Sequence, residues 1–325
     1  MLPSAATDFY ATQQRVSLTA RNEVRRLWSR MGDDFDASWR RIRPAVVNVV
    51  NEGKLVMAER ADEYVPRLLE QADIPDRPEG DIVPESFAGM ASDGRQLDTL
   101  ADQAVIRAKT AVGGGVTTAE ALDGSGKWLA LVAMNEVADA ARVAVGVLTA
   151  SRKNVGGHVR VLNPPSCPRC AILGGRFYRW STGFSRHPPT CDCTMAPVPS
   201  REYAEAEGFI QSPMEAWRKG EVRGLTEAQQ RALEDGADII RVVNAQRGVS
   251  AISPHTRVVN RRGEIPQEAG VQPGQPDLLA FLNRDTRFRS TQARQSALTP
   301  EGIYQIAGND RDLAIRLLGE HGYIR

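Results

Sequence analysis

The residues of this chain best suited to chemistry are its cysteines. All four cysteines of the 325-residue chain, Cys167, Cys170, Cys191 and Cys193, lie within 27 residues of one another, and His187 lies four residues before Cys191. The first pair has the CxxC spacing with which a tight turn presents two thiolates to one metal ion. Prolines beside both pairs stiffen the loops that carry these side chains. The spacing therefore predicts one structural zinc ion.

Five side chains are candidate ligands, whereas a structural zinc takes four. Two thiolates separated by one residue are sterically tighter than a CxxC pair. We therefore expect the ligands to be Cys167, Cys170, His187 and one of Cys191 and Cys193, with Cys191 favoured. A closed set of four ligands leaves no position for a reactive water, which indicates structure and not catalysis. The alternatives are four reduced thiols without metal, or a redox-active CxxC, which no βαβ pattern supports.

No arrangement of residues predicts catalysis. The chain has four histidines and no GxSxG motif. A serine protease needs a serine, a histidine and an acid brought together in space, and candidates such as Ser185 beside His187 cannot be ranked from sequence. His158, beside two glycines, is expected to be a solvated or hydrogen-bonded loop residue. We predict that the chain is not an enzyme.

The elements that must position the cysteines fall into three zones. Residues 1–151 carry apolar side chains at three- and four-residue steps, which predicts helices. Residues 152–200 replace this periodicity with Gly, Pro, Cys and aromatic residues, and HVRVL and RFYRW are typical of short strands. Residues 201–325 return to helical patterns around a loop-rich basic stretch. The predicted fold is mainly α, with a helical N-terminal domain, a small zinc-stabilised α+β module and a mostly helical C-terminal region.

The basic residues point to local contacts only. The formal net charge is +1, so the chain as a whole is not an electrostatic nucleic-acid binder. The loop-rich C-terminal stretch interleaves arginines with Phe281 and Phe288, which favours contact with DNA or with an acidic protein surface. The candidate residues are Arg257, Arg261, Arg262, Arg284, Arg287 and Arg289. No apolar run reaches membrane-spanning length and no signal peptide is visible, so we expect no membrane association.

The cysteine region also carries a family resemblance. NPPSCPRCAILGGRFYRW followed by GFSRHPPTCDCTMAPV resembles the signature of the Mu F-like minor head proteins of tailed bacteriophages, in which a CxxC precedes an HPxCxC-type run and Pro-Val. The later segments DGADIIRVVNAQRG and LTPEGIYQIA are similar to minor capsid proteins of actinobacterial phages. The resemblance covers roughly residues 155–325. HPPTCDC is one residue longer than HPxCxC, so Cys191 and Cys193 both remain candidate ligands.

The resemblance implies a structural minor capsid protein inside the phage head, near the portal vertex, assembled in the host cytoplasm. It implies contact with the portal protein, and further with packaged double-stranded DNA and the major capsid protein, in several copies per virion. Two alternatives remain, a capsid maturation protease and a nucleic-acid-binding zinc module. Because Trp28, Trp39 and Trp128 lie on amphipathic helical faces, we expect those faces to contact the portal or a neighbouring copy.

Overall fold

The computed structural model describes residues 3–182, 184, 193–245, 306–308 and 310–320. The chain divides into two units, residues 1–223 and 224–325. The first unit contains the long helices and the one sheet found in the described residues.

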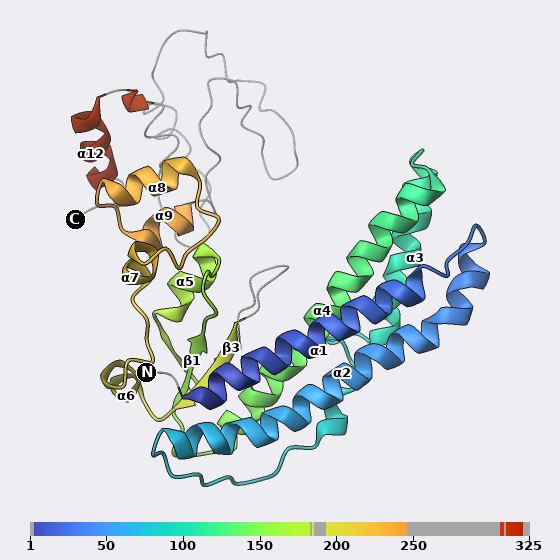
Figure 1. The fold of residues 1–325 in the computed structure, drawn as a ribbon, viewed down its shortest axis with the longest axis horizontal. Coiled ribbons are helices and arrows are strands. Elements are labelled where there is room, and N and C mark those ends of the chain that lie inside the picture. The colour runs from blue at the N-terminus through green and yellow to red at the C-terminus, as the bar shows by residue number, and fades with distance from the viewer. Residues whose placement is uncertain (1–2, 183, 185–192, 246–305, 309, 321–325) are drawn as a thin grey trace, which may run out of the picture. The chain divides into compact units, whose positions relative to one another are not determined.

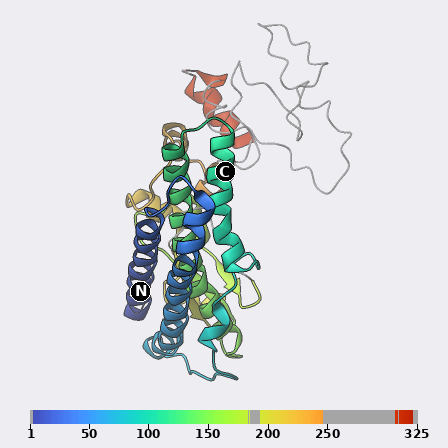
Figure 2. The same cartoon turned by 90° about the vertical axis from the view of Figure 1, so that its right-hand side faces the viewer.

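Four long helices form the body of the first unit (Figure 1): α1 (Ser4–Trp28), α2 (Phe35–Gln71), α3 (Leu97–Gly113) and α4 (Thr118–Ala150). Helix α4 packs against each of the other three, and α1 and α2 also pack against each other. Figure 2, turned by 90°, shows α1, α2 and α4 running alongside one another. The four helices therefore form one packed bundle.

Local sequence signals set where two of these helices begin. The side chain of Asp34 accepts a hydrogen bond from the backbone N–H of Ala37 at 2.9 Å, at the start of α2. Thr117 and Glu120 form a capping box at the start of α4. Such caps satisfy backbone N–H groups that have no partner within the helix.

The tryptophans of the helical zone are packed by the chain itself. Trp28 and Trp39 are buried and meet edge to face, with ring centroids 5.8 Å apart. The indole N–H of Trp28 donates to the backbone oxygen of Leu122 at 2.8 Å. Trp128 is half-buried, and the guanidinium of Arg107 lies 5.0 Å above its ring. Trp28 and Trp39 therefore cannot supply the partner surface that we expected from the sequence, and Trp128 is partly covered.

The sheet has three antiparallel strands with the order β2-β1-β3. Strand β1 (Gly157–Val161) lies between β2 (Phe177–Arg179) and β3 (Thr194–Val198). Successive residues of a strand point to opposite faces. Val159 and Val161 therefore face one way, and both are buried in the core that the strands share with the helices.

One apolar core joins this sheet to the helices. Val159 and Val161 pack in it with side chains of α1, α2 and α4. Tyr64 of α2 stacks on Phe9 of α1 with ring centroids 4.2 Å apart, and its hydroxyl donates to the backbone oxygen of Met195 in β3 at 2.8 Å. The sheet is thereby bound to the bundle by apolar packing and by a buried hydrogen bond.

The structure divides the chain differently from the sequence-based prediction. The predicted boundary between a helical domain, 1–151, and a separate module, 152–200, runs through the shared core, because the sheet buries one face on the helices. The boundary between the two units lies instead after Arg223. The first unit also contains the short helices η1 (Pro84–Phe87), α5 (Pro168–Gly174), α6 (Arg201–Ala206) and α7 (Pro213–Arg218).

The described part of the second unit is helical. Helices α8 (Glu227–Glu234) and α9 (Ile239–Ala245) pack against each other, and α12 (Arg311–Glu320) follows later in the chain. The turn between α8 and α9 contains Gly236 at φ +95°, a conformation that favours glycine. The prediction of a mainly α fold with one small sheet is thus confirmed. None of the described helices is long and apolar enough to span a bilayer.

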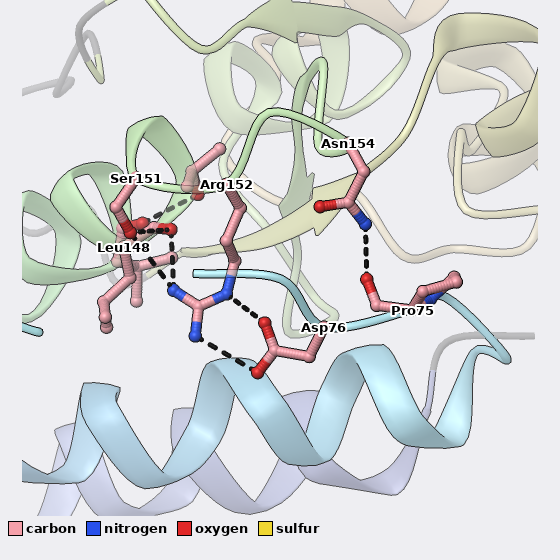
Figure 3. A network of polar contacts seen from close by, with 8 residues as sticks. Pro75, Asp76, Leu148, Ser151, Arg152 and Asn154 are labelled. Atoms are coloured by element: carbon pink, nitrogen blue, oxygen red, sulfur yellow. Dashed lines mark hydrogen bonds and ion pairs between the residues drawn. The ribbon is translucent and has the colours of Figure 1, made fainter. Parts of the chain in front are cut away.

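A buried arginine fastens the long connector between α2 and α3 to the end of α4 (Figure 3). Arg152 is 3% exposed, and its guanidinium binds the carboxylate of Asp76 through contacts of 2.5 and 3.2 Å. It also donates to the backbone oxygen of Leu148 at 2.9 Å. Asn154 donates to the backbone oxygen of Pro75 close by. A cation at a helix C-terminus interacts favourably with the helix dipole and with its last carbonyls.

We predict that Asp76→Asn lowers the free energy of unfolding by about 2 kcal/mol, because it leaves the buried charge of Arg152 without its carboxylate. The matched control is Glu63→Gln, which makes the same chemical change in the exposed Arg60–Glu63 pair and should have little effect. Urea unfolding of both variants measures the difference. Equal stability of the two variants would show that the Arg152–Asp76 ion pair does not contribute to the free energy of unfolding.

Candidate metal centre

The CxxC pair lies at the start of helix α5. Cys167 is the N-cap residue, and its sulfur accepts a hydrogen bond from the backbone N–H of Cys170 at 3.3 Å. Pro168 occupies the first helical turn, where its missing N–H costs nothing. Cys170 is buried within the helix at 2% exposure. One helical turn thus carries both sulfurs, as the spacing predicted.

Cys193, 23 positions after Cys170 in the sequence, lies beside this turn. It directly precedes β3, is 1% exposed, and has its Sγ atom 3.7 Å from Sγ of Cys170. Two sulfurs on one tetrahedral zinc, each about 2.3 Å from the ion, lie about 3.8 Å apart, whereas sulfurs of a disulfide lie about 2.05 Å apart. None of the described cysteines forms a disulfide. The observed separation suits two ligands of one ion.

The other predicted ligands and the predicted basic contact residues lie in parts of the chain that the structure does not describe. His187 and Cys191 lie outside the described residues. Among the residues that are described, no three His, Cys, Asp or Glu side chains form a group that could hold a metal ion. The zinc therefore stays a prediction. The structure shows two adjacent sulfurs, those of Cys170 and Cys193, and places Cys167 beside Cys170. The basic set is also outside the described part of the chain: Arg257, Arg261, Arg262, Arg284, Arg287 and Arg289.

Two buried arginines surround Cys193. Arg160 of β1 donates to the sulfur of Cys193 at 3.2 Å, and Arg142 of α4 donates to its backbone oxygen at 3.0 Å. Each arginine is 2% exposed. Arg142 also forms an ion pair with Asp139 at 2.6 Å. Arg160 thus contacts the sulfur of Cys193, and Arg142 contacts the backbone of the same residue.

An aromatic ring covers both guanidinium groups. Phe184 lies 3.9 Å from the guanidinium carbon of Arg160 and 5.1 Å from that of Arg142, measured to the ring centroid. The same ring packs against the buried sulfurs of Cys170 and Cys193. Apolar cover lowers the local dielectric constant, which strengthens each electrostatic contact beneath it.

His158 corrects an expectation from the sequence. We expected a loop residue, but His158 lies in β1, is 1% exposed and stacks on Tyr178 with ring centroids 5.4 Å apart. Its Nδ1 atom is buried with no hydrogen-bond partner among the described residues. Burial, and secondarily the charge of Arg160, lower its pKa to about 4. The side chain is therefore neutral and buried, on the face of the sheet opposite to Val159 and Val161.

The sequence analysis missed the two arginines and Phe184. The alternation in HVRVL places His158 and Arg160 on one face of the strand, opposite Val159 and Val161. That signal could have paired the histidine with Arg160. The sequence carries no comparable signal for Arg142, which appears only as a charge within an apolar helix. Its meeting with Cys193, 51 positions away, is a tertiary contact.

We predict that titration of His158 destabilises the protein in acid. Because its folded-state pKa is about 4 and the unfolded value is about 6.5, stability is full above pH 6.5 and falls as the unfolded chain alone takes up a proton. The loss between pH 7 and pH 5 should be about 2 kcal/mol. Urea unfolding at both pH values measures it. His158→Phe keeps a stacking ring and should remove this part of the pH dependence; an unchanged pH dependence would contradict the assignment.

Comparison with known proteins adds no relative. No protein-family model, curated protein or solved structure matches the chain.

Proposed function

We propose that this chain is a structural minor capsid protein of a tailed phage, whose sheet and short helices are held together by one structural zinc ion. The observation that carries the zinc part of the proposal is the 3.7 Å separation of the Cys170 and Cys193 sulfurs, which suits adjacent corners of a zinc tetrahedron; the capsid role rests on the sequence motif. The motif around these residues supports the Mu F-like assignment. The proposed ligands are Cys167, Cys170, His187 and one thiolate of the CxC pair.

The burial of the sulfurs supports a structural role over a catalytic one. Cys170 and Cys193 are 2% and 1% exposed, and Leu162 and Phe184 pack against them. A catalytic zinc keeps a coordination position open to water and substrate. Ligands sealed by apolar side chains favour a closed set of four, which provides cohesion and no reaction.

The zinc would add a direct link between α5 and the residue that precedes β3. Helix α5 and the start of β3 are separated along the chain by Gly175 to Asp192, and the sheet itself has only three short strands. The sheet already packs one face on the helices, which is enough to stabilise three strands, so the zinc would reinforce an existing fold. A structural zinc contributes on the order of 10 kcal/mol in small domains. Metal binding would therefore fix α5 and β3 relative to each other.

The proposed contact with the portal uses the outer faces of the helical bundle. Because Trp28 and Trp39 are in the bundle's own core, the contact would depend on exposed side chains. Leu18 and Ile106 are the kind of isolated apolar residues, 41% and 50% exposed, that a partner helix could cover. Contacts with packaged DNA and the major capsid protein are proposed from the resemblance alone. No observation in the described part of the chain favours the protease or the nucleic-acid-binding alternative.

The first prediction from this proposal concerns the metal. Purified full-length protein should contain about one zinc ion per chain, and Cys170→Ser should lower both the zinc content and the unfolding temperature because it removes a thiolate ligand. Ala171→Ser, which introduces the same residue at the neighbouring buried position, is the matched control and should keep the zinc. Elemental analysis by mass spectrometry gives the stoichiometry. Metal-free wild-type protein with undiminished stability would end the zinc proposal.

The second prediction concerns location. Mass spectrometry of purified virions of the phage that encodes this chain should detect it uncleaved, at a few copies for many copies of the major capsid protein, and it should co-purify with the portal. The low number follows from a site at one vertex of the head. Particles that are complete but lack the chain would contradict a structural role in the virion and favour a transient assembly function.

A further inference from the structure

We infer that the groove between helices α2 and α3 is the docking site for an amphipathic helix of the portal protein. That helix carries an apolar side chain and an acidic side chain one turn apart. The inference rests on the proposed function, because it assigns a surface and a partner chemistry to the portal contact proposed above, and it does not require the zinc ion. We call this surface the α2–α3 groove.

The α2–α3 groove has two walls, each formed by one face of a helix. Four residues of each helix line it, from Asp36 to Arg43 in α2 and from Asp102 to Lys109 in α3. Both sets have the spacing i, i+3, i+4 and i+7, which places their members on a single helical face over two turns. The groove has a volume of about 440 Å³. Grooves between helices are a common docking site for the apolar face of a further helix.

Ion pairs lie at both ends of the α2–α3 groove. At one end, Nζ of Lys109 lies 2.6 Å from each carboxylate oxygen of Asp36. At the other end, Nε of Arg43 donates to Asp102 at 2.7 Å, and the indole N–H of Trp39 donates to the same carboxylate oxygen at 2.8 Å. These contacts, together with the apolar packing of α2 on α3, hold the two walls in place. A preformed groove binds its partner at a smaller cost in conformational entropy.

The middle of the α2–α3 groove is apolar. Trp39 and Val105 are buried, at 7% and 5% exposure, and form its floor, whereas Ile106 is 50% exposed on the α3 wall. Covering this isoleucine with an apolar side chain of a partner removes apolar surface from water, which is favourable. Leu18, the other exposed residue considered for the portal contact, does not line the groove. Ile106 is therefore the apolar contact point.

Arg40 gives the α2–α3 groove its preference for an acidic partner. The other four charged residues that line the groove pair across it at its two ends. Within the described part of the chain no carboxylate pairs with Arg40, so one positive charge is left on the wall opposite Ile106. A carboxylate beside the partner's apolar side chain complements this charge. Residues three or four apart on a helix lie on the same face, so one helical turn supplies both groups.

The composition of the groove favours a protein helix over a nucleic acid. Its lining contains three basic and two acidic residues around an apolar centre. Phosphate backbones are bound by basic and small polar side chains, and the carboxylates of Asp36 and Asp102 would repel them. A helix with an apolar centre and charged flanks matches the groove in both respects, and the proposed function supplies the portal as its source.

The first arm of the test measures binding of the full-length chain to purified portal protein of the same phage by surface plasmon resonance. Ile106→Glu places a carboxylate in the apolar centre, and Arg40→Glu reverses the charge that selects an acidic partner. Each should weaken binding by about 10-fold or more. The matched controls are Leu18→Glu and Arg41→Glu, the same substitutions at exposed positions that do not line the groove. They should leave the dissociation constant nearly unchanged, and circular dichroism checks that all four variants are folded.

The second arm tests the acidic group of the partner. Each exposed acidic residue on the portal's helices is changed to lysine in turn, and binding to the Arg40→Glu variant is measured. One such lysine should restore binding to Arg40→Glu, because the two charges are then exchanged, and it should not restore binding to Ile106→Glu. Absence of any restoring lysine would contradict an acidic helix as the occupant.

The outcomes separate the docking site from the proposed function. Weakened binding in both groove variants, with normal binding in both controls, supports the site. Normal portal binding by the groove variants would overturn the site and leave the proposed function intact. Wild-type protein that does not bind portal would overturn both the site and the portal contact. If the groove variants instead convert a wild-type dimer to a monomer in sedimentation and still bind portal, the occupant is a second copy of this chain and the portal assignment is wrong.

Discussion

The rest of the structure depends on the packing of the sheet against the helices. Val159 and Val161 of β1 are buried among side chains of α1, α2 and α4, and this single apolar interface fixes where the strand lies. Because residues alternate along a strand, it also determines that His158 and Arg160 point to the other face. Everything at the candidate metal centre follows from that orientation: a shift of one residue would put a guanidinium in the apolar core and a valine beside the cysteines.

The candidate centre is correspondingly assembled from distant parts of the chain. Cys170 comes from α5, Cys193 from the start of β3, Arg160 from β1 and Arg142 from α4. Burying a guanidinium carries a large desolvation cost, which only well-directed contacts offset. The contacts to the sulfur and to the backbone oxygen of Cys193 are of this kind. These two contacts explain the position of Cys193.

A third buried arginine, in addition to Arg142 and Arg160, makes contacts of the same kind away from the cysteines. Arg152 closes the C-terminal end of α4 and holds the connector from α2 through Asp76 (Figure 3). Arg152 and Arg160 each connect segments that are far apart along the chain, Arg152 to Asp76 and Arg160 to Cys193. In each place a charge-assisted hydrogen bond fixes a geometry that apolar packing alone would leave loose. The first unit thus combines apolar clusters in its interior with directional polar contacts between its segments.

The sequence by itself determined the mainly α character, two of the three short strands, β1 and β2, and the turn of the CxxC pair, because these depend on local periodicity and on neighbouring residues. It also singled out the cysteines as a group. It did not indicate β3. It did not determine that the sheet and the helices share one core, that Trp28 and Trp39 are buried by their own chain, or that His158 is buried and neutral. Nor could it bring Arg160 to Cys193. Those results depend on which surfaces meet, and such contacts between distant segments are set by the packing of the whole unit, which no local pattern encodes.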